Sequence, residues 1–100
     1  MGKASRPRPK RLPAKLLRIR QMLGVSQNGM SRLLGFDKTK LPQDYISSYE
    51  LGKREPPLPV LLQYARVAGT SMEVLVDDEL DLPEKLPVGR RGATKITSKK

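Results

Sequence analysis

The segment "FDKTKLPQDYISSYELGKREPP" at residues 36–57 decides the fold of this chain. It predicts a helix over residues 42–51, bounded by a loop before it and a proline-rich turn after it. Pro42 suits the first position of a helix, because the N–H that proline lacks would have no partner there. Gly52 suits the position just beyond the end, because glycine enters the left-handed backbone region without steric cost. Two cationic residues follow Gly52 at once, so the helix has a basic exit.

The rest of the chain predicts four more short helices and shows no strand-like alternation. They are expected over residues 13–23, 26–34 (with Ser26 as N-cap), 59–68 and 72–76 (with Ser71 as N-cap). Apolar residues at helical spacing are expected to form the core: Leu16, Ile19, Leu23, Met30, Leu33, Leu34, Ile46, Tyr49, Val60, Leu61, Leu62, Ala65, Ala68, Met72 and Leu75. The predicted fold class is therefore all-α, a compact domain of five helices.

Charge is distributed unevenly along the chain, whose formal net charge is +10. Residues 1–23 hold eight Lys or Arg and no acid, whereas residues 77–84 hold five acids and no base. Cationic ends favour a polyanionic partner such as DNA, RNA or an anionic membrane surface. The predicted organisation is a disordered basic arm over 1–11, a helical domain over 12–76, an acidic proline-containing extension over 77–88 and a disordered basic tail over 89–100.

The composition argues against several classes of function. The chain has no cysteine and no histidine, so it lacks thiolate metal ligands and the commonest general base. We therefore expect no enzyme, no cofactor and no metal. The acidic run at residues 77–81 does not match a calcium loop, because the turn glycine and the bidentate glutamate are missing. No stretch approaches the roughly 20 apolar residues of a membrane-spanning helix, so no membrane partner is expected.

Three stretches together carry a family resemblance. They are "LRIRQMLGVSQ" (17–27), "ISSYELGKREPP" (46–57) and "LLQYARVAGTSMEVLV" (61–76). Over about residues 14–76 the chain resembles the Cro and lambda-repressor type of regulator, also called the XRE-type helix-turn-helix family. The resemblance implies that the second and third helices form a helix-turn-helix. It also implies a sequence-specific regulator of transcription that reads double-stranded DNA with the helix at about 42–51.

The turn between the second and third helices departs from the family pattern, in which it is short. In the usual register the inward branched residue would be Leu41, and Pro42 would then lie inside the third helix. Proline there would break a hydrogen bond and clash, at a cost of about 3 kcal/mol. We therefore expect Ile46 in that role, with an enlarged turn that carries Lys38 and Lys40 near the path of DNA phosphates.

The first half of the third helix carries the side chains expected to read base edges. Glutamine pairs with adenine, a carboxylate accepts from cytosine, and serine can do either. The expected base-reading residues are Gln43, Asp44, Ser47 and Ser48, with Tyr45 beside them to touch a thymine methyl group or a sugar. Asp44 has a second reading, because the helix dipole favours a carboxylate at this end while nearby phosphates would repel it.

The remaining candidates are expected to bind the DNA backbone or to support the fold. Gln27 resembles the family's phosphate-anchoring glutamine, and Lys53 and Arg54 are expected on phosphates. The arm residues Arg6, Arg8, Lys10 and Arg11 are expected to enter the adjacent minor groove. The plain alternative for these side chains is a solvated surface. The resemblance also implies a structural ion pair between Arg20 and Glu50.

One helix-turn-helix reads only a few base pairs, so we expect a homodimer on a palindrome, formed through helices 59–68 and 72–76 or segment 77–88. The resemblance implies a cytoplasmic, bacterial or phage repressor. The alternative is an antitoxin-like protein-interaction module that also regulates its own operon, with the acidic segment 77–84 as the partner surface. A third reading is a non-specific nucleic-acid binder driven by the tails. The acidic segment is otherwise expected to repel DNA or to dock on the chain's own basic tail.

Overall fold

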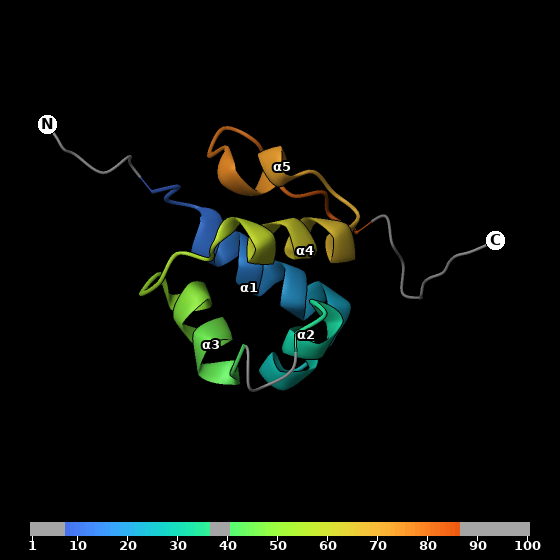
Figure 1. The fold of residues 1–100 in the computed structure, drawn as a ribbon. Helices are drawn as coiled ribbons and strands as arrows, with labels where there is room; N and C mark the ends of the chain where they lie inside the picture. The colour runs from blue at the N-terminus through green and yellow to red at the C-terminus, as the bar shows by residue number, and fades with distance from the viewer. Residues whose placement is uncertain (1–7, 37–40, 87–100) are drawn as a thin grey trace, which may run out of the picture.

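The computed structural model describes residues 8–36 and 41–86 and shows an all-helical domain (Figure 1). Its helices are α1 Leu12–Leu23, α2 Gln27–Leu33, α3 Gln43–Leu51, α4 Leu58–Ala68 and α5 Met72–Val76. The described residues form no strand. In Figure 1, α1 and α4 cross the middle of the domain, α5 lies on one side of them, and α2 and α3 lie on the other. The predicted fold of five helices is confirmed.

The helix ends follow from local side-chain chemistry. The Ser26 hydroxyl accepts a hydrogen bond from the Gly29 backbone nitrogen at 3.0 Å, and so caps the start of α2. Gly52 ends α3 with φ at 77°, in the left-handed region that other residues rarely adopt. A Cβ atom at Gly52 would also lie 3.3 Å from Cγ of Pro13. The glycine therefore both terminates α3 and allows the start of α1 to approach it closely.

Three helix starts differ by one residue from the prediction. Pro42 precedes α3 as its N-cap, with φ −61° and ψ 156°, and is not the first helical residue. α1 and α4 begin at Leu12 and Leu58, one residue ahead of Pro13 and Pro59. Backbone N–H groups throughout the first turn have no carbonyl partner within the helix, so proline fits several of these positions. Proline therefore locates the first turn of a helix and leaves its first residue open.

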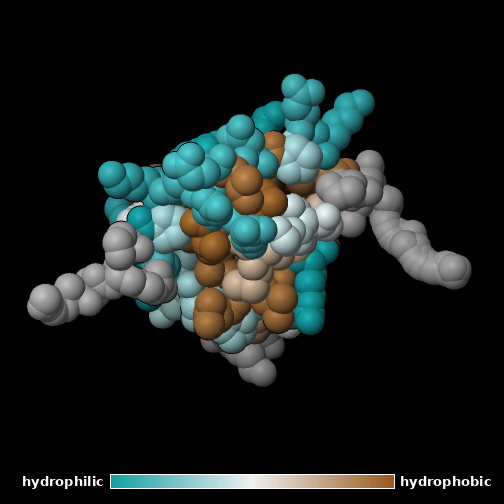
Figure 2. All heavy atoms as spheres, turned by 90° about the horizontal axis from the view of Figure 1, so that it is seen from above, coloured by the Kyte–Doolittle hydropathy of each residue, from teal (hydrophilic) through white to brown (hydrophobic). Residues whose placement is uncertain are grey.

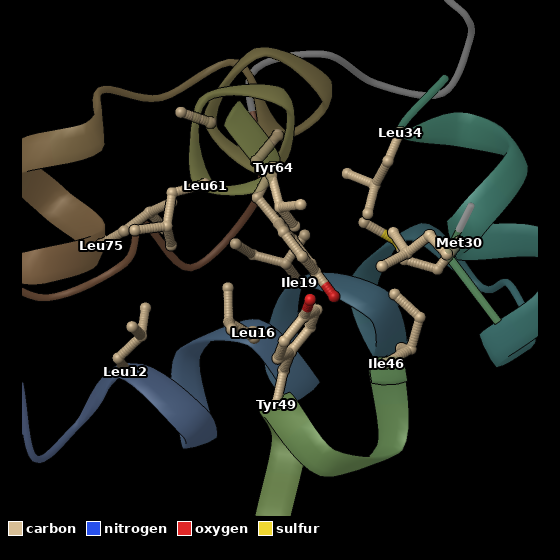
Figure 3. Packing of buried hydrophobic residues seen from close by; sticks show 14 residues of the cluster. Leu12, Leu16, Ile19, Met30, Leu34, Ile46, Tyr49, Leu61, Tyr64 and Leu75 are labelled. Atoms are coloured by element: carbon tan, nitrogen blue, oxygen red, sulfur yellow. The ribbon is translucent and has the colours of Figure 1, made fainter. Parts of the chain in front are cut away.

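The core is one cluster to which all the described helices contribute (Figure 3). Its largest fully buried side chains are Tyr64, Leu16, Ile19, Met30, Leu34, Ile46, Leu75 and Ser31. In Figure 3 the ring of Tyr64 extends from α4 into the centre of the cluster, near Ile19 and Tyr49. The apolar pattern misses Tyr64, since its hydroxyl gives it an intermediate preference for burial.

Two leucines predicted in the core lie at the surface instead. Leu33 of α2 is 46% exposed and Leu62 of α4 is 36% exposed. Leu23 and Met72 are only partly buried against the cluster. The helices bury a narrower stripe than the prediction assigned, because each packs on its neighbours along one face. On α2 the buried residues are Met30, as predicted, and Ser31, which the apolar pattern could not identify.

The connection from α2 to α3 is enlarged, as the position of Pro42 predicts. α2 ends at Leu33, one residue earlier than expected, and α3 begins at Gln43. Ile46 is completely buried and Leu41 is 3% exposed, so both candidates for the inward position reach the core. The Ser31 hydroxyl donates to the Leu41 carbonyl oxygen at 2.8 Å, which ties the end of the connection to α2.

The start of α1 is held by the acidic segment that follows α5. The Asp78 carboxylate accepts hydrogen bonds from the backbone nitrogens of Lys10 and Arg11, both at 2.9 Å. The Arg11 guanidinium donates to the Asp78 carbonyl oxygen at 2.7 Å and also pairs with the Asp81 carboxylate. We call these four residues the acidic clamp. Lys10 and Arg11, which the prediction assigns to the basic arm, thus make defined contacts with the acidic segment.

Lys15 makes the reciprocal contact, from α1 to the end of α5. Its side chain is buried, and Nζ donates to the carbonyl oxygens of Val74 at 2.7 Å and Asp77 at 2.9 Å. These carbonyls belong to the last turn of α5 and its exit, where a cation is favoured by the helix dipole. Burial, together with the nearby Arg11, lowers the pKa of Lys15 below its ordinary value. Each of the two helices is thus capped by a residue distant in sequence.

Acidification should weaken the acidic clamp. The backbone hydrogen bonds from Arg11 and Lys10 lower the pKa of Asp78, and the Arg11 side chain lowers the pKa of Asp81. Such carboxylates bind fewer protons in the folded chain than in the unfolded one, so they stabilise the fold above their unfolded pKa and lose this effect as the pH falls. We expect the thermal unfolding midpoint, followed by circular dichroism, to fall below about pH 4. The fall of the midpoint should be smaller in Asp78→Asn, which has lost the titrating carboxylate, than in Glu79→Gln. Equal falls in the two variants would contradict the role of Asp78 in the pH dependence.

Candidate nucleic-acid interface

α3 lies at the edge of the domain and exposes one face. It packs on α1 and α2 through buried Ile46 and Tyr49, and Figure 1 places it on the side of the domain away from α5. The side chains expected to read bases come to the other face: Gln43 and Asp44 are exposed, and Ser47 and Ser48 are partly exposed. Residues four apart on a helix share a face, so these four form one polar strip. The strip offers amide, carboxylate and hydroxyl groups, which match the donors and acceptors of base edges.

Tyr45 is held between two neighbours instead of standing free. The Arg54 guanidinium carbon lies 4.0 Å from the centre of the Tyr45 ring, in a cation–π contact. The Tyr45 and Tyr49 rings meet edge to face, with centroids 6.5 Å apart. The sequence predicts separate roles for Tyr45 and Arg54 and contains no signal for the stack. The stack fixes a cation beside the polar strip of α3.

The basic exit of α3 is fixed by its backbone. The nitrogens of Lys53 and Arg54 donate to the carbonyl oxygen of Ser48 at 2.9 and 3.3 Å. Both side chains are exposed. The exit of α3 thus presents two cations in a defined place, a suitable arrangement for phosphate.

Arg20, Glu50 and Gln27 join the three helices around this site. Arg20 Nε lies 2.6 Å from Glu50 Oε2, and Arg20 Nη2 lies 3.0 Å from Glu50 Oε1, which makes a two-pronged ion pair between α1 and α3. The Glu50 side chain is only 5% exposed. Gln27, the first residue of α2, donates from Nε2 to Glu50 Oε1 at 3.2 Å. The hydrogen bond to Glu50, with burial opposing it, raises the pKa of Arg20 above an already high value. Glu50 therefore sets the position of α3 relative to both other helices.

The Tyr64 hydroxyl lies in the same region and has no hydrogen-bond partner among the described residues. Burial, reinforced by Glu50, raises the pKa of Tyr64 far above its ordinary value. The phenol stays neutral at all ordinary pH values. Tyr64 therefore contributes to this region through the volume of its ring.

The remaining predicted DNA contacts are divided between described and undescribed parts of the chain. Arg6, Lys38 and Lys40 lie outside the described residues. Arg8 is described and its side chain is exposed. Lys10 is also exposed, but its backbone nitrogen belongs to the acidic clamp, and the Arg11 guanidinium is turned to Asp81. The acidic segment therefore docks on the start of α1, and its predicted docking on the basic tail at 89–100 lies outside the described residues.

Within residues 8–36 and 41–86, no helix is long and apolar enough to cross a membrane. In the same ranges, no group of three or more acidic side chains is arranged to hold a metal ion.

Comparison with known proteins identifies the arrangement. A family model described as "Helix-turn-helix" matches residues 16–75, which include α2 and α3 and most of the domain around them. No curated protein and no solved structure matches the chain.

Proposed function

Since the chain belongs to the XRE-type helix-turn-helix family, a non-enzymatic family of DNA-binding transcription regulators, we propose that it reads a specific duplex sequence with α3. The observation that carries the proposal is the polar strip Gln43, Asp44, Ser47 and Ser48 on the open face of a buttressed helix. A helix of this kind fits the major groove of B-form DNA, where each base pair presents a distinct pattern of donors and acceptors.

The surroundings of α3 supply the groups for phosphate contacts. Lys53 and Arg54 follow the helix directly, and the Tyr45 ring holds Arg54 in place. Gln27 lies at the start of α2, where the helix dipole also favours an anion, and its Nε2 donates to Glu50. We assign these residues to the DNA backbone, and we keep the same role for Lys38 and Lys40. Arg6, Arg8 and Lys10 remain our candidates for the minor groove and for the phosphates that line it.

A homodimer on a palindromic site is the second part of the proposal. Apolar side chains are exposed on α4 and α5: Leu58 is 68%, Leu62 36% and Val76 38% exposed. Figure 2, which looks onto the domain from the side of α5, shows a band of hydrophobic residues across this face. In Figure 1 α5 lies on the side of the domain away from α3, so pairing through the side of α5 would leave α3 free for DNA.

The antitoxin-like alternative has less support from the geometry. Its expected partner surface is the acidic segment at residues 77–84. Asp78 and Asp81 of that segment are already engaged with Lys10 and Arg11 of the same chain. A protein partner would have to displace these contacts or use the remaining acids.

Selection of binding sites from a random duplex pool, at physiological salt and with the full chain, tests the proposal. We expect one palindromic motif whose half-sites are about one helical turn apart. Gln43→Ala should relax the preference at one position of each half-site, by about 1–3 kcal/mol. Gln21→Ala, which removes an exposed glutamine from α1, should leave the motif unchanged. Recovery of no motif, with binding that fades steeply as salt rises, would show that the tails bind DNA and that α3 does not read it.

A further inference from the structure

We propose that the acidic clamp positions the N-terminal arm for DNA binding, so that Arg8 joins Lys53 and Arg54 in one phosphate-binding surface. The inference rests on the proposed function, because it concerns how the same interface holds the DNA backbone. It assigns a role in DNA binding to Asp78, an acid that simple electrostatics would count as harmful to DNA binding.

Arg8 lies beside the exit of α3. Arg8 and Pro9 form one side of a small surface hollow, and Gly52, Arg54, Glu55 and Pro56 contribute to the other. Both arginines of the hollow have exposed side chains. The described end of the arm therefore reaches the loop that carries the basic exit of α3, although the two are distant in sequence.

The acidic clamp restrains the backbone next to Arg8. Asp78 holds the backbone nitrogens of two successive residues, Lys10 and Arg11, each at 2.9 Å. The next residue toward the N-terminus is Pro9, whose ring fixes its φ angle. Few free rotations therefore separate the clamp from Arg8, and the clamp sets the direction in which the arm leaves α1.

The clamp lowers the cost of ordering the arm. Arg8, Lys53 and Arg54 carry like charges, and the Glu55 carboxylate in the same hollow offsets part of their repulsion, so charge alone does not fix where the arm lies. The clamp fixes the arm through contacts to its backbone, which leave the Arg8 side chain available. DNA then meets cations already in place and loses less of the affinity that ordering an arm would cost.

The direction in which DNA affinity changes when one negative charge is removed distinguishes positioning of the arm from simple electrostatic attraction. Asp78→Asn and Glu79→Gln each remove one negative charge from the same segment, and both should tighten DNA binding if charge alone matters. Glu79 makes no side-chain contact in the clamp, so it is the matched control. If the clamp positions the arm, Asp78→Asn should weaken binding in spite of the favourable charge change.

The experiment measures the Kd of the full chain for a fluorescent mixed-sequence duplex of about 20 base pairs, long enough for two half-sites, over a series of salt concentrations. We expect Asp78→Asn to bind about threefold or more weakly, with a salt slope smaller by about 0.9, as for the loss of one phosphate contact. Glu79→Gln should bind as well as the unmodified chain or better. Arg8→Ala should show the same loss as Asp78→Asn, and the double variant should lose no more than either single one.

Thermal unfolding of each variant defines the temperature range in which binding is compared. If Asp78→Asn does not fold, Arg8→Ala decides the question, because an unchanged Kd and salt slope for that variant would overturn the inference. Tighter binding by both Asp78→Asn and Glu79→Gln would also overturn it while leaving the proposed function intact. Failure of the unmodified chain to bind any duplex would overturn the proposed function, and the inference with it.

Discussion

Replacing Glu50 with alanine should cost about 3 kcal/mol or more of unfolding free energy, because it leaves the Arg20 guanidinium in a largely buried place without its partner. Glu50 accepts from Arg20 through both carboxylate oxygens and from Gln27 of α2. Domains of this size have little stability to spare, so the loss is a large share of the total. Urea denaturation followed by circular dichroism measures it.

DNA binding should be lost together with stability in the Glu50→Ala variant. Without Glu50, α3 either unfolds or changes its tilt relative to α1 and α2, and the polar strip no longer faces the groove as a unit. Glu73→Ala, which removes an exposed glutamate from α5, is the control and should change both quantities little. A Glu50→Ala chain with native stability and native affinity would refute the structural role assigned to the pair.

The second large effect is expected at Tyr64. The side chain is completely buried in the centre of the core, so Tyr64→Ala should cost about 3–5 kcal/mol through lost contacts and the cavity left behind. Tyr64→Phe keeps the ring and removes a hydroxyl that has no partner among the described residues. It should therefore keep stability within about 1 kcal/mol, and a gain is the expected direction.

Urea denaturation of the two Tyr64 variants separates the ring from the hydroxyl. A Tyr64→Phe variant as unstable as Tyr64→Ala would show that the hydroxyl makes a bond that holds the core together. A stable Tyr64→Ala variant would show that the surrounding side chains collapse into the space, contrary to the packing in Figure 3.

The order and type of the helices could be read from the chain because their signals are local. Ser26 and Ser71 cap helices through their own hydroxyls, and Gly52 ends α3 because its backbone adopts a left-handed conformation. Pro42 excluded the short turn, and α3 begins directly after it. Single boundaries were wrong by a residue, since proline fits several positions of a first turn.

The inward faces were harder to assign than the helices. Leu33 and Leu62 are apolar and at helical spacing, yet both lie at the surface, whereas Ser31 and Tyr64 are buried. Hydropathy measures the preference of a side chain and does not include the hydrogen bond that lets a polar group be buried. Ser31 is buried because the carbonyl of Leu41 accepts its proton, and that partner is known only once the chain is folded.

The candidate DNA-reading residues came from one contiguous segment, so helical periodicity alone could group Gln43, Asp44, Ser47 and Ser48 on one face. The stack of Arg54 on Tyr45 lies within the same segment, but it depends on the path of the loop after Gly52. The acidic clamp could not be predicted from the sequence. Asp78 is 68 and 67 residues away from Lys10 and Arg11 along the chain, and only folding brings them into contact.

By itself, then, the sequence determined which stretches are helical, where they end to within one residue and which helix presents polar groups, because each of these depends on neighbours within a few residues. Only the tertiary structure decided that Asp78 caps α1, that Lys15 caps α5 and that Arg8 lies beside the exit of α3. Carboxylates, ammonium groups and backbone N–H groups are compatible with many partners along the chain. The packing of α1 against α4 and α5 selects one of those partners by bringing it within hydrogen-bonding distance.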